Sequence, residues 1–113
     1  MNVKSETLPN GVGVIEVRGP LLGDQEIAEL RKAIAEFIDR QWKRLLIDLT
    51  EATFLNSTGM GVLVSAHTSY AKRGWQLKLC GINRQVNLVF AVTNLRKVFS
   101  IHEHRDDALK NFS

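Results

Sequence analysis

Residues 46–63 read Leu-Ile-Asp-Leu-Thr-Glu-Ala-Thr-Phe-Leu-Asn-Ser-Thr-Gly-Met-Gly-Val-Leu, and this stretch indicates the fold class. The nearly continuous apolar run Leu45–Leu49 is typical of a short strand covered on both faces. A polar turn over Thr53–Gly59 follows this strand. Beyond the turn, apolar residues recur at helical spacing until Gly74 ends the helix. A buried strand that leads through a turn into a helix is the unit of an α/β fold.

The residues before this unit predict a hairpin and an amphipathic helix. Residues 12–18 alternate enough to form a strand, which the following Gly-Pro pair ends. Asn10-Gly11 signals a hairpin turn from a short first strand near Val3. From Asp24, the expected N-cap, apolar side chains fall at steps of three and four up to about Arg40. This spacing predicts a helix with one buried stripe.

The residues after the unit predict four further elements. A strand is expected over Trp75–Cys80, a short helix from about Arg84, a last strand over Val98–Ile101 and a closing helix over Arg105–Phe112. A chain of 113 residues has the size of one domain, so we expect a single domain over residues 1–113. The sequence therefore predicts an α/β fold, a mixed open β-sheet with about four helices packed on it.

The composition and charge of the chain exclude several classes of protein. Hydrophobic residues make up 44% and charged residues 24%, which is unlike a disordered or collagen-like chain. The single cysteine, Cys80, excludes an intrachain disulfide and a multi-cysteine zinc site. The formal charge is +3, but no dense stripe of cations is present, so we expect no direct nucleic-acid binding. No signal-peptide core or membrane-spanning stretch is evident, so we expect a cytoplasmic chain without membrane insertion.

Polar residues gather at the predicted start of the helix after the buried strand. Asn56, Ser57 and Thr58 lie where the first backbone N–H groups of a helix lack intrahelical partners and where its dipole favours an anion. These residue types are also the preferred N-caps, so ordinary capping is an alternative explanation for them. Gly59 and Gly61 favour a second role. Glycine inside a helix costs about 1 kcal/mol relative to alanine, and two of them indicate a close approach to the backbone.

The residues outside this turn do not assemble a catalytic or metal site. Gly59-Met60-Gly61 lacks the third glycine of a dinucleotide fingerprint, and the chain has no phosphate loop. His67 lies on the apolar stripe of its helix, about 15 Å along the axis from Ser57, which is too far for a nucleophile and its base. His102 and His104 would share one face of a strand, and surface positions explain them better than metal ligation. We therefore expect no enzyme activity and no cofactor.

Residues 46–63 resemble the signature of the STAS domain, the fold of bacterial anti-sigma factor antagonists. The usual signature is a strand ending in Asp-Leu, an apolar pair, and Asp-Ser-(Ser/Thr)-Gly-(Leu/Met)-Gly, which corresponds here to Asn56–Gly61. The similarity covers nearly the whole chain. It includes Val-Arg-Gly at the end of the second strand, the long helix after it, the Gly-Trp-Gln-Leu-Lys-Leu-Cys-Gly strand at 74–81, and Asp-Asp-Ala-Leu at 106–109. The resemblance implies a single STAS-type domain.

The resemblance also implies partner switching controlled by phosphorylation. Members of the family bind an anti-sigma factor that is a serine kinase, and a phosphatase reverses the phosphorylation that this kinase performs. Only the unphosphorylated form sequesters the kinase. By position Ser57 matches the phosphorylated serine, with Thr58 as the fallback. The implied partner-binding residues are Asn56, Ser57, Thr58, Gly59, Met60, Gly61 and Leu63.

Two departures from the family pattern affect this surface, and two other functions remain open. Asn56 stands where the family has Asp, which removes a negative charge beside the acceptor hydroxyl, and residues 20–23 replace an acidic Glu-Leu-Asp segment. Similar stand-alone domains serve as cytoplasmic accessory subunits of lipid-trafficking ABC transporters, and this is the alternative function. A small enzyme with Ser57 as its nucleophile is a third hypothesis, which the absence of a nearby base disfavours.

Overall fold

The computed structural model describes residues 2–112, so the expected domain at 1–113 extends one residue beyond them at each end. The elements in chain order are β1 (Val3–Thr7), β2 (Val12–Leu21), α1 (Asp24–Asp39), β3 (Arg44–Leu55), α2 (Ser57–Lys72), β4 (Gln76–Cys80), α3 (Arg84–Val92), the 3₁₀ turn η1 (Leu95–Lys97), β5 (Ser100–His102) and α4 (Arg105–Lys110). The expected α/β fold with a mixed sheet and four helices is confirmed.

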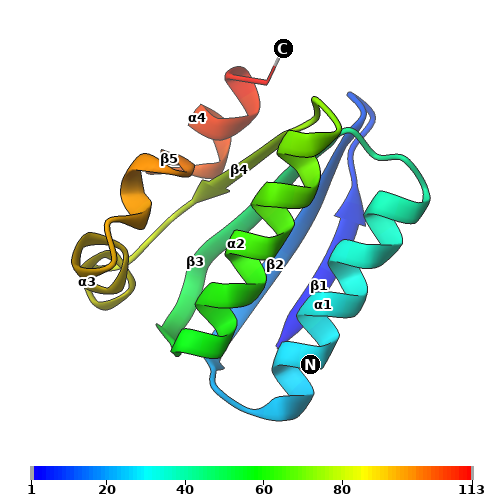
Figure 1. The fold of residues 1–113 in the computed structure, drawn as a ribbon. Helices are drawn as coiled ribbons and strands as arrows, with labels where there is room; N and C mark the ends of the chain where they lie inside the picture. Colours follow the sequence, from blue (N-terminus) through cyan, green and yellow to red (C-terminus); the bar gives the residue numbers. More distant parts are fainter. Residues whose placement is uncertain (1, 113) are drawn as a thin grey trace.

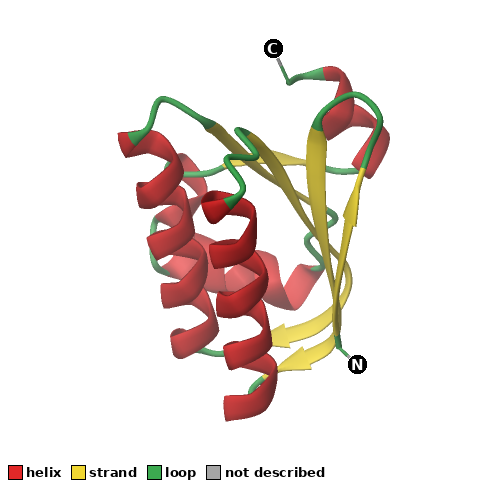
Figure 2. Ribbon diagram, turned by 90° about the vertical axis from the view of Figure 1, so that its right-hand side faces the viewer, coloured by secondary structure: helices red, strands yellow, loops and turns green. Residues whose placement is uncertain are grey.

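The order of the strands in the sheet explains why the helices gather on one face. The sheet has the order β1-β2-β3-β4-β5, with β1 antiparallel to β2 and the remaining pairs parallel. Each parallel connection steps in the same direction, and such connections are right-handed, so their helices are placed on the same side. Figure 1 shows α1 and α2 lying side by side over the strands, and Figure 2 shows α4 beyond the other face.

Two apolar clusters follow from this arrangement. The larger cluster lies between the sheet and α1, α2 and α3, and it buries side chains such as Ile47, Leu63 and Phe90. The smaller one lies under α4 and consists of Val12, Val14, Leu46, Cys80 and Ala108. The central strand β3 contributes to both, which confirms the prediction that Leu45–Leu49 is covered on both faces.

Arg105 fastens α4 to the sheet. Its guanidinium donates to Oδ2 of Asp48 at 3.0 Å, to Oε1 of Glu6 at 2.6 Å and to Oε2 of Glu16 at 3.1 Å. These carboxylates come from three adjacent strands. Burial alone would raise the pKa of Asp48, but hydrogen bonds from Thr50 and Arg105 outweigh it and hold the pKa below its ordinary value.

The two central strands are longer than predicted. β2 passes through its Gly-Pro pair and ends at Leu21, and β3 continues to Leu55, through residues that were expected to form a turn. The extensions pair with each other, since Gly19 faces Ala52 and Leu21 faces Leu55. Register shifts accompany them, one of them at Pro20, as is usual for proline inside a sheet.

Several predicted boundaries also shift by a few residues. The N-cap of α1 is Gly23 rather than Asp24, which lies in the first helical turn with its carboxylate near the positive end of the dipole. The last strand begins at Ser100 rather than Val98, because η1 occupies the preceding residues. The closing helix ends at Lys110 instead of Phe112. None of these shifts changes the topology.

Candidate functional site

The start of α2 is organised by the side chain of Asn56. This residue is the N-cap, and its Oδ1 accepts a hydrogen bond from the backbone N–H of Gly59 at 2.8 Å. The helix therefore begins at Ser57, inside the stretch that was predicted as a turn, because an Asn cap accepts a hydrogen bond from the third amide after it. The two hydroxyl residues consequently lie in the first helical turn, not in a preceding loop.

The same Asn56 side chain also ties α2 to a distant segment. Its Nδ2 donates to the carbonyl of Leu22 at 3.2 Å, which holds the loop between β2 and α1 beside the start of α2. A carboxylate at this position could not make that bond at neutral pH, because it has no hydrogen to donate. The departure from the family's Asp therefore has a structural role in this chain.

The side chains of Ser57 and Thr58 are exposed to solvent. In the described part of the chain, neither side chain has a hydrogen-bond partner. Their own backbone N–H groups belong to the first helical turn, where no intrahelical acceptor exists. The oxygens of a phosphate on Ser57 would lie near the backbone N–H groups of the first turn, where the helix dipole favours negative charge.

The two glycines of the first turns have different explanations. A Cβ atom on Gly59 would come within 3.0 Å of the methyl groups of both Leu21 and Leu55, so this glycine is needed for packing inside the protein. A Cβ atom on Gly61 would meet nothing within 4 Å. Only Gly61, which is exposed, leaves its backbone open to a partner.

The predicted partner-binding residues fall into an accessible and a buried group. Asn56, Ser57, Thr58 and Gly61 are at least partly accessible. Gly59 is buried and Leu63 has no exposed surface, so these two support the site from within the core. Met60 is 5% exposed but still lines the groove described next.

An apolar groove with a volume of about 630 Å³ runs beside Ser57, between α2 and the segment formed by α3 and η1. No described residue that lines it is titratable. The residues that line the groove are Phe54, Leu55, Asn56, Ser57, Met60, Gly61, Val64, Val89, Thr93 and Leu95. Sequence reasoning considered the α2 side of this groove and missed the α3 side, which lies at least 25 residues further along the chain.

Three large apolar side chains on β3 and α3 are exposed, one of which, Phe54, lines the groove. Phe54 at the end of β3 is 39% exposed, and Leu88 and Val92 on α3 are 57% and 83% exposed. The sequence does hold a signal for the last two, because they are four residues apart and lie off the α3 stripe that buries Val86 and Phe90. Apolar side chains clustered at the surface of a small domain mark an interaction site.

The remaining candidates of the sequence do not form a reactive site. His67 packs its ring against Phe99, with ring centres 5.3 Å apart, and His104 lies beyond the last strand, so it does not share a strand with His102. Within residues 2–112 no group of histidine, cysteine and carboxylate side chains could hold a metal ion. Burial and the neighbouring Asp48 raise the pKa of the Cys80 thiol to about 12, so it stays protonated at neutral pH.

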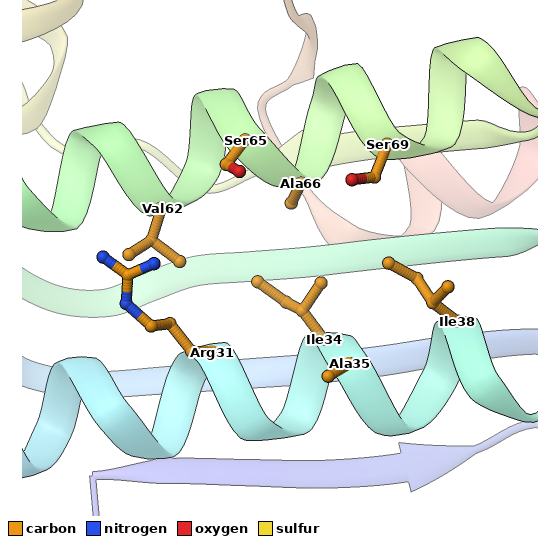
Figure 3. A pocket seen from close by; sticks show the side chains of 8 residues that line it. All are labelled: Arg31, Ile34, Ala35, Ile38, Val62, Ser65, Ala66 and Ser69. Atoms are coloured by element: carbon orange, nitrogen blue, oxygen red, sulfur yellow. The ribbon is translucent and has the colours of Figure 1, made fainter.

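A second, smaller hollow of about 170 Å³ lies on the seam between α1 and α2. Figure 3 shows it between Ile34 and Ile38 of α1 and the small residues Ser65, Ala66 and Ser69 of α2. The hollow follows from the small residues, which leave space between two packed helices. It is less than a third of the groove in volume, and its position away from Ser57 separates it from the candidate site.

Comparison with known proteins identifies the family. The family model described as "STAS domain" matches residues 5–108. The chain belongs to the STAS domain family.

No helix among residues 2–112 has both the length and the apolar character needed to cross a membrane.

Relatives with this domain carry one recurring name. The anti-sigma-B factor antagonist of Listeria monocytogenes is 32% identical over 73 residues, which are 65% of this chain and 64% of the relative. The match thus spans slightly less than two thirds of that protein. An anti-sigma factor antagonist of Mycobacterium paratuberculosis matches in structure with a TM-score of 0.85 and 25% identity, over 96% of this chain and 90% of that one. The phosphorylated form of the Bacillus cell fate determinant SpoIIAA has a TM-score of 0.77 at 16% identity, over 96% of each chain, which is a likeness of fold.

Proposed function

We propose that this protein is an anti-sigma factor antagonist that binds an anti-sigma factor with serine-kinase activity and is released when that kinase phosphorylates Ser57. One observation supports this most. Ser57 presents an exposed hydroxyl, without an internal hydrogen bond, on the rim of the apolar groove between α2 and α3. In this role the protein is a cytoplasmic binding module without a reaction of its own.

The groove supplies the attraction and the phosphate supplies the switch. Burying apolar surface stabilises a complex by about 25 cal/mol per Å² before the costs of association are subtracted. A phosphate on Ser57 adds a charge of about −1.5 to −2 at the edge of that surface. A partner that covers the groove would then have to strip water from this charge, which is strongly unfavourable.

The modification is expected to act on the complex and to leave the fold intact. The phosphate would lie at the N-terminus of α2, where the dipole and the free amides of the first turn favour an anion. SpoIIAA, at 14% and 16% identity, matches this fold with a TM-score of 0.77 in its unphosphorylated and its phosphorylated form alike. That both forms match the same fold supports a switch in which the phosphate changes the binding surface and leaves the fold unchanged.

Capture of partners from the native cell tests this function. Immobilised protein is incubated with cell extract, with and without phosphatase treatment, and the bound proteins are identified by mass spectrometry. We expect the wild type and Ser57→Ala to capture an anti-sigma factor with a kinase domain. Incubation of the wild type with that kinase and ATP should place one phosphate on Ser57, and the phosphorylated protein should no longer be captured.

Two outcomes contradict the proposal. Phosphate on Thr58 alone would overturn the assignment of Ser57, although both hydroxyls are exposed. Capture of an ATPase and a permease in place of a kinase would support the accessory subunit of a lipid transporter.

A further inference from the structure

The turns that end α1 and α2 have the same construction. Residues 37–42 read Phe-Ile-Asp-Arg-Gln-Trp and residues 70–75 read Tyr-Ala-Lys-Arg-Gly-Trp. In each, an arginine is followed by a residue with positive φ, 58° at Gln41 and 72° at Gly74, and then by tryptophan. In each turn the backbone N–H of the tryptophan donates a hydrogen bond to the carbonyl of the aromatic residue five positions earlier, Phe37 or Tyr70, at 2.9 Å. These bonds are those of a Schellman helix end.

Both turns place a guanidinium over an indole. Arg40 lies 5.8 Å from the ring centre of Trp42, and Arg73 lies 5.5 Å from that of Trp75. The Tyr70 hydroxyl donates to the carbonyl of Trp42 at 2.8 Å and so joins the two turns. Because β3 and β4 are neighbours, the paired turns form one surface at the end of the molecule, which we name the Arg-Trp end.

The Arg-Trp end carries the excess positive charge of the whole chain. Residues 37–44 and 70–76 contain five cations and one carboxylate, Asp39, so their net charge is +4. The whole chain has a net charge of only +3, and the remaining residues together are therefore slightly acidic. The five cations are Arg40, Lys43, Arg44, Lys72 and Arg73.

Most of this charge is not neutralised within the protein. In the described part of the chain, the salt bridges involve Arg18 and Arg105, and none involves Arg40, Lys43, Lys72 or Arg73. A hollow of about 400 Å³ in this surface is lined by Lys43, Arg44, Gly74, Trp75 and Gln76. The tertiary structure brings together cations that are scattered in the sequence, four of them exposed, and a group of this kind is a surface for an anionic partner.

We propose that the Arg-Trp end binds the surface of an anionic lipid bilayer. Four to eight clustered Lys and Arg residues suffice for attraction to anionic headgroups, and tryptophan is enriched at the level of those headgroups. Single-stranded nucleic acid fits less well. Base stacking needs free aromatic faces, whereas each indole here is covered by an arginine on one face and meets Phe37 or Tyr70 at an edge.

The bilayer and the anti-sigma factor would use opposite ends of the protein. α2 has 16 residues and a length of about 24 Å, with Ser57 at its first residue and the Arg-Trp end at its last turn. In Figure 1 the upper ends of α1 and α2 both lie away from the start of α2, which is at the lower left. Adsorption therefore leaves the groove beside Ser57 free, and the inference does not depend on the proposed function.

Vesicle sedimentation with the full chain tests the proposal. The probes are phosphatidylcholine vesicles with and without 30% phosphatidylserine, at low salt and at 0.5 M NaCl. We expect binding only to the anionic vesicles and its loss at high salt. Each cation near the surface contributes about a fivefold factor, so Lys43→Gln with Lys72→Gln should lower the partition coefficient by at least tenfold.

A control variant and the fluorescence of the tryptophans distinguish binding through the Arg-Trp end from attraction by the overall charge of the protein. Lys32→Gln with Lys97→Gln removes two exposed cations elsewhere and should change partition less than twofold. Both tryptophans of the chain lie at the Arg-Trp end, so brominated lipids should quench their fluorescence. Equal losses in the two double variants, or no binding to the anionic vesicles, would overturn the proposal. So would binding of an oligonucleotide that depends on Lys43 and Lys72 while vesicles are not bound.

Discussion

At position 56 one side-chain amide performs two structural tasks that a carboxylate would perform only in part. Its oxygen caps α2, and its nitrogen holds the carbonyl of Leu22. The bond holds the backbone of Leu22, whose apolar side chain is 46% exposed, beside the start of α2. Asn56 thus places a neutral amide beside Ser57 and a hydrogen bond to the β2–α1 loop where the family pattern has a carboxylate.

We predict that Ser57→Asp weakens partner binding while the fold remains stable. An anion at a helix N-terminus is worth about 0.3–1 kcal/mol in favour of the helix, so the melting temperature should stay within a few degrees of the wild type. The Kd for the anti-sigma factor should rise at least about tenfold, which equals about 1.4 kcal/mol. Calorimetry of the wild type and Ser57→Asp measures the melting temperature and the Kd. Ser65→Asp, at an exposed position on the same helix, is the control. An unchanged Kd would remove Ser57 from the contact surface.

Gly59 and Gly61 should respond in opposite directions to the same substitution. Gly61→Ala adds a methyl group into open space inside a helix and should stabilise the protein by about 0.5–1 kcal/mol. Gly59→Ala forces a methyl group against Leu21 and Leu55, both buried, and should destabilise it by about 1–3 kcal/mol. Urea unfolding of the pair measures the difference. Equal stabilities would mean that the packing around Gly59 yields easily.

Gly61→Leu extends the comparison to binding. Its side chain begins in open space next to the groove, so we expect weaker partner binding without loss of stability. Titration of the anti-sigma factor with this variant and a thermal melt give the two readings. If the Kd and the melt both stay at the wild-type values, the α2 side of the groove is not part of the interface.

Sequence reasoning located the polar turn of the candidate site but not the surface around it. The turn could be located because a polar cap between a buried strand and a helix is a local pattern, whereas Ser57 within it was implied by the resemblance to the family. The groove depends on how α3 and η1 pack against α2, and residues such as Val89 and Leu95 reveal this only when the tertiary structure is known. Gly59 similarly appeared to be a contact residue, whereas the methyl groups that explain it belong to two strands.

At the scale of elements, Arg105 should determine the attachment of α4. Arg105→Gln removes an ionic contact with three strands and leaves Asp48, which is 5% exposed, without its cation. We expect a loss of about 2 kcal/mol in the free energy of unfolding, near the middle of the range for hydrogen bonds to charged groups. Denaturant unfolding measures the loss, and hydrogen exchange in residues 105–110 should rise with it. Lys110→Gln, an exposed change on the same helix, should have little effect.

The pH dependence of stability should report the same contact. The pKa of Asp48 is lower in the folded protein than its ordinary value of 3.8, so its ionised form stabilises the fold above that value. This contribution is lost as the pH falls through the lower, folded pKa. The wild type should therefore lose stability below about pH 4, and Arg105→Gln should lose less over the same interval. If the stability of the two proteins falls equally with pH, Arg105 contributes little to the lowered pKa of Asp48.

The elements themselves were predictable wherever one local signal dominated. The α1 stripe, the Asn10-Gly11 hairpin and the Gly74 helix end are signals of this kind, and all three are present. The long ends of β2 and β3 were not predictable, because the segments after Asp48 and around Pro20 contain polar residues, glycine and proline, which favour turns. They form strands because each supplies the other with hydrogen-bond partners.

For the molecule as a whole, Cys80 should serve as an internal reporter of global unfolding. The thiol is fully buried between the sheet and α4, and its raised pKa, about 12, keeps it protonated. We predict that a thiol reagent at neutral pH reacts with it only at the rate at which the chain unfolds. Mass spectrometry of alkylation in increasing urea measures this. Rapid alkylation in native buffer would show that α4 opens separately from the rest of the fold.

The order β1-β2-β3-β4-β5 also matches the order in which a ribosome releases the strands. Each strand pairs with the one synthesised just before it, so no strand has to be inserted later between two that are already joined. β2 and β3 with α1 lie within the first 55 residues and can assemble while the remainder is still being translated. Pairing between chain neighbours keeps the closed loops short, which favours fast folding. The sheet can therefore grow from one edge to the other during synthesis and end at the three-residue strand β5.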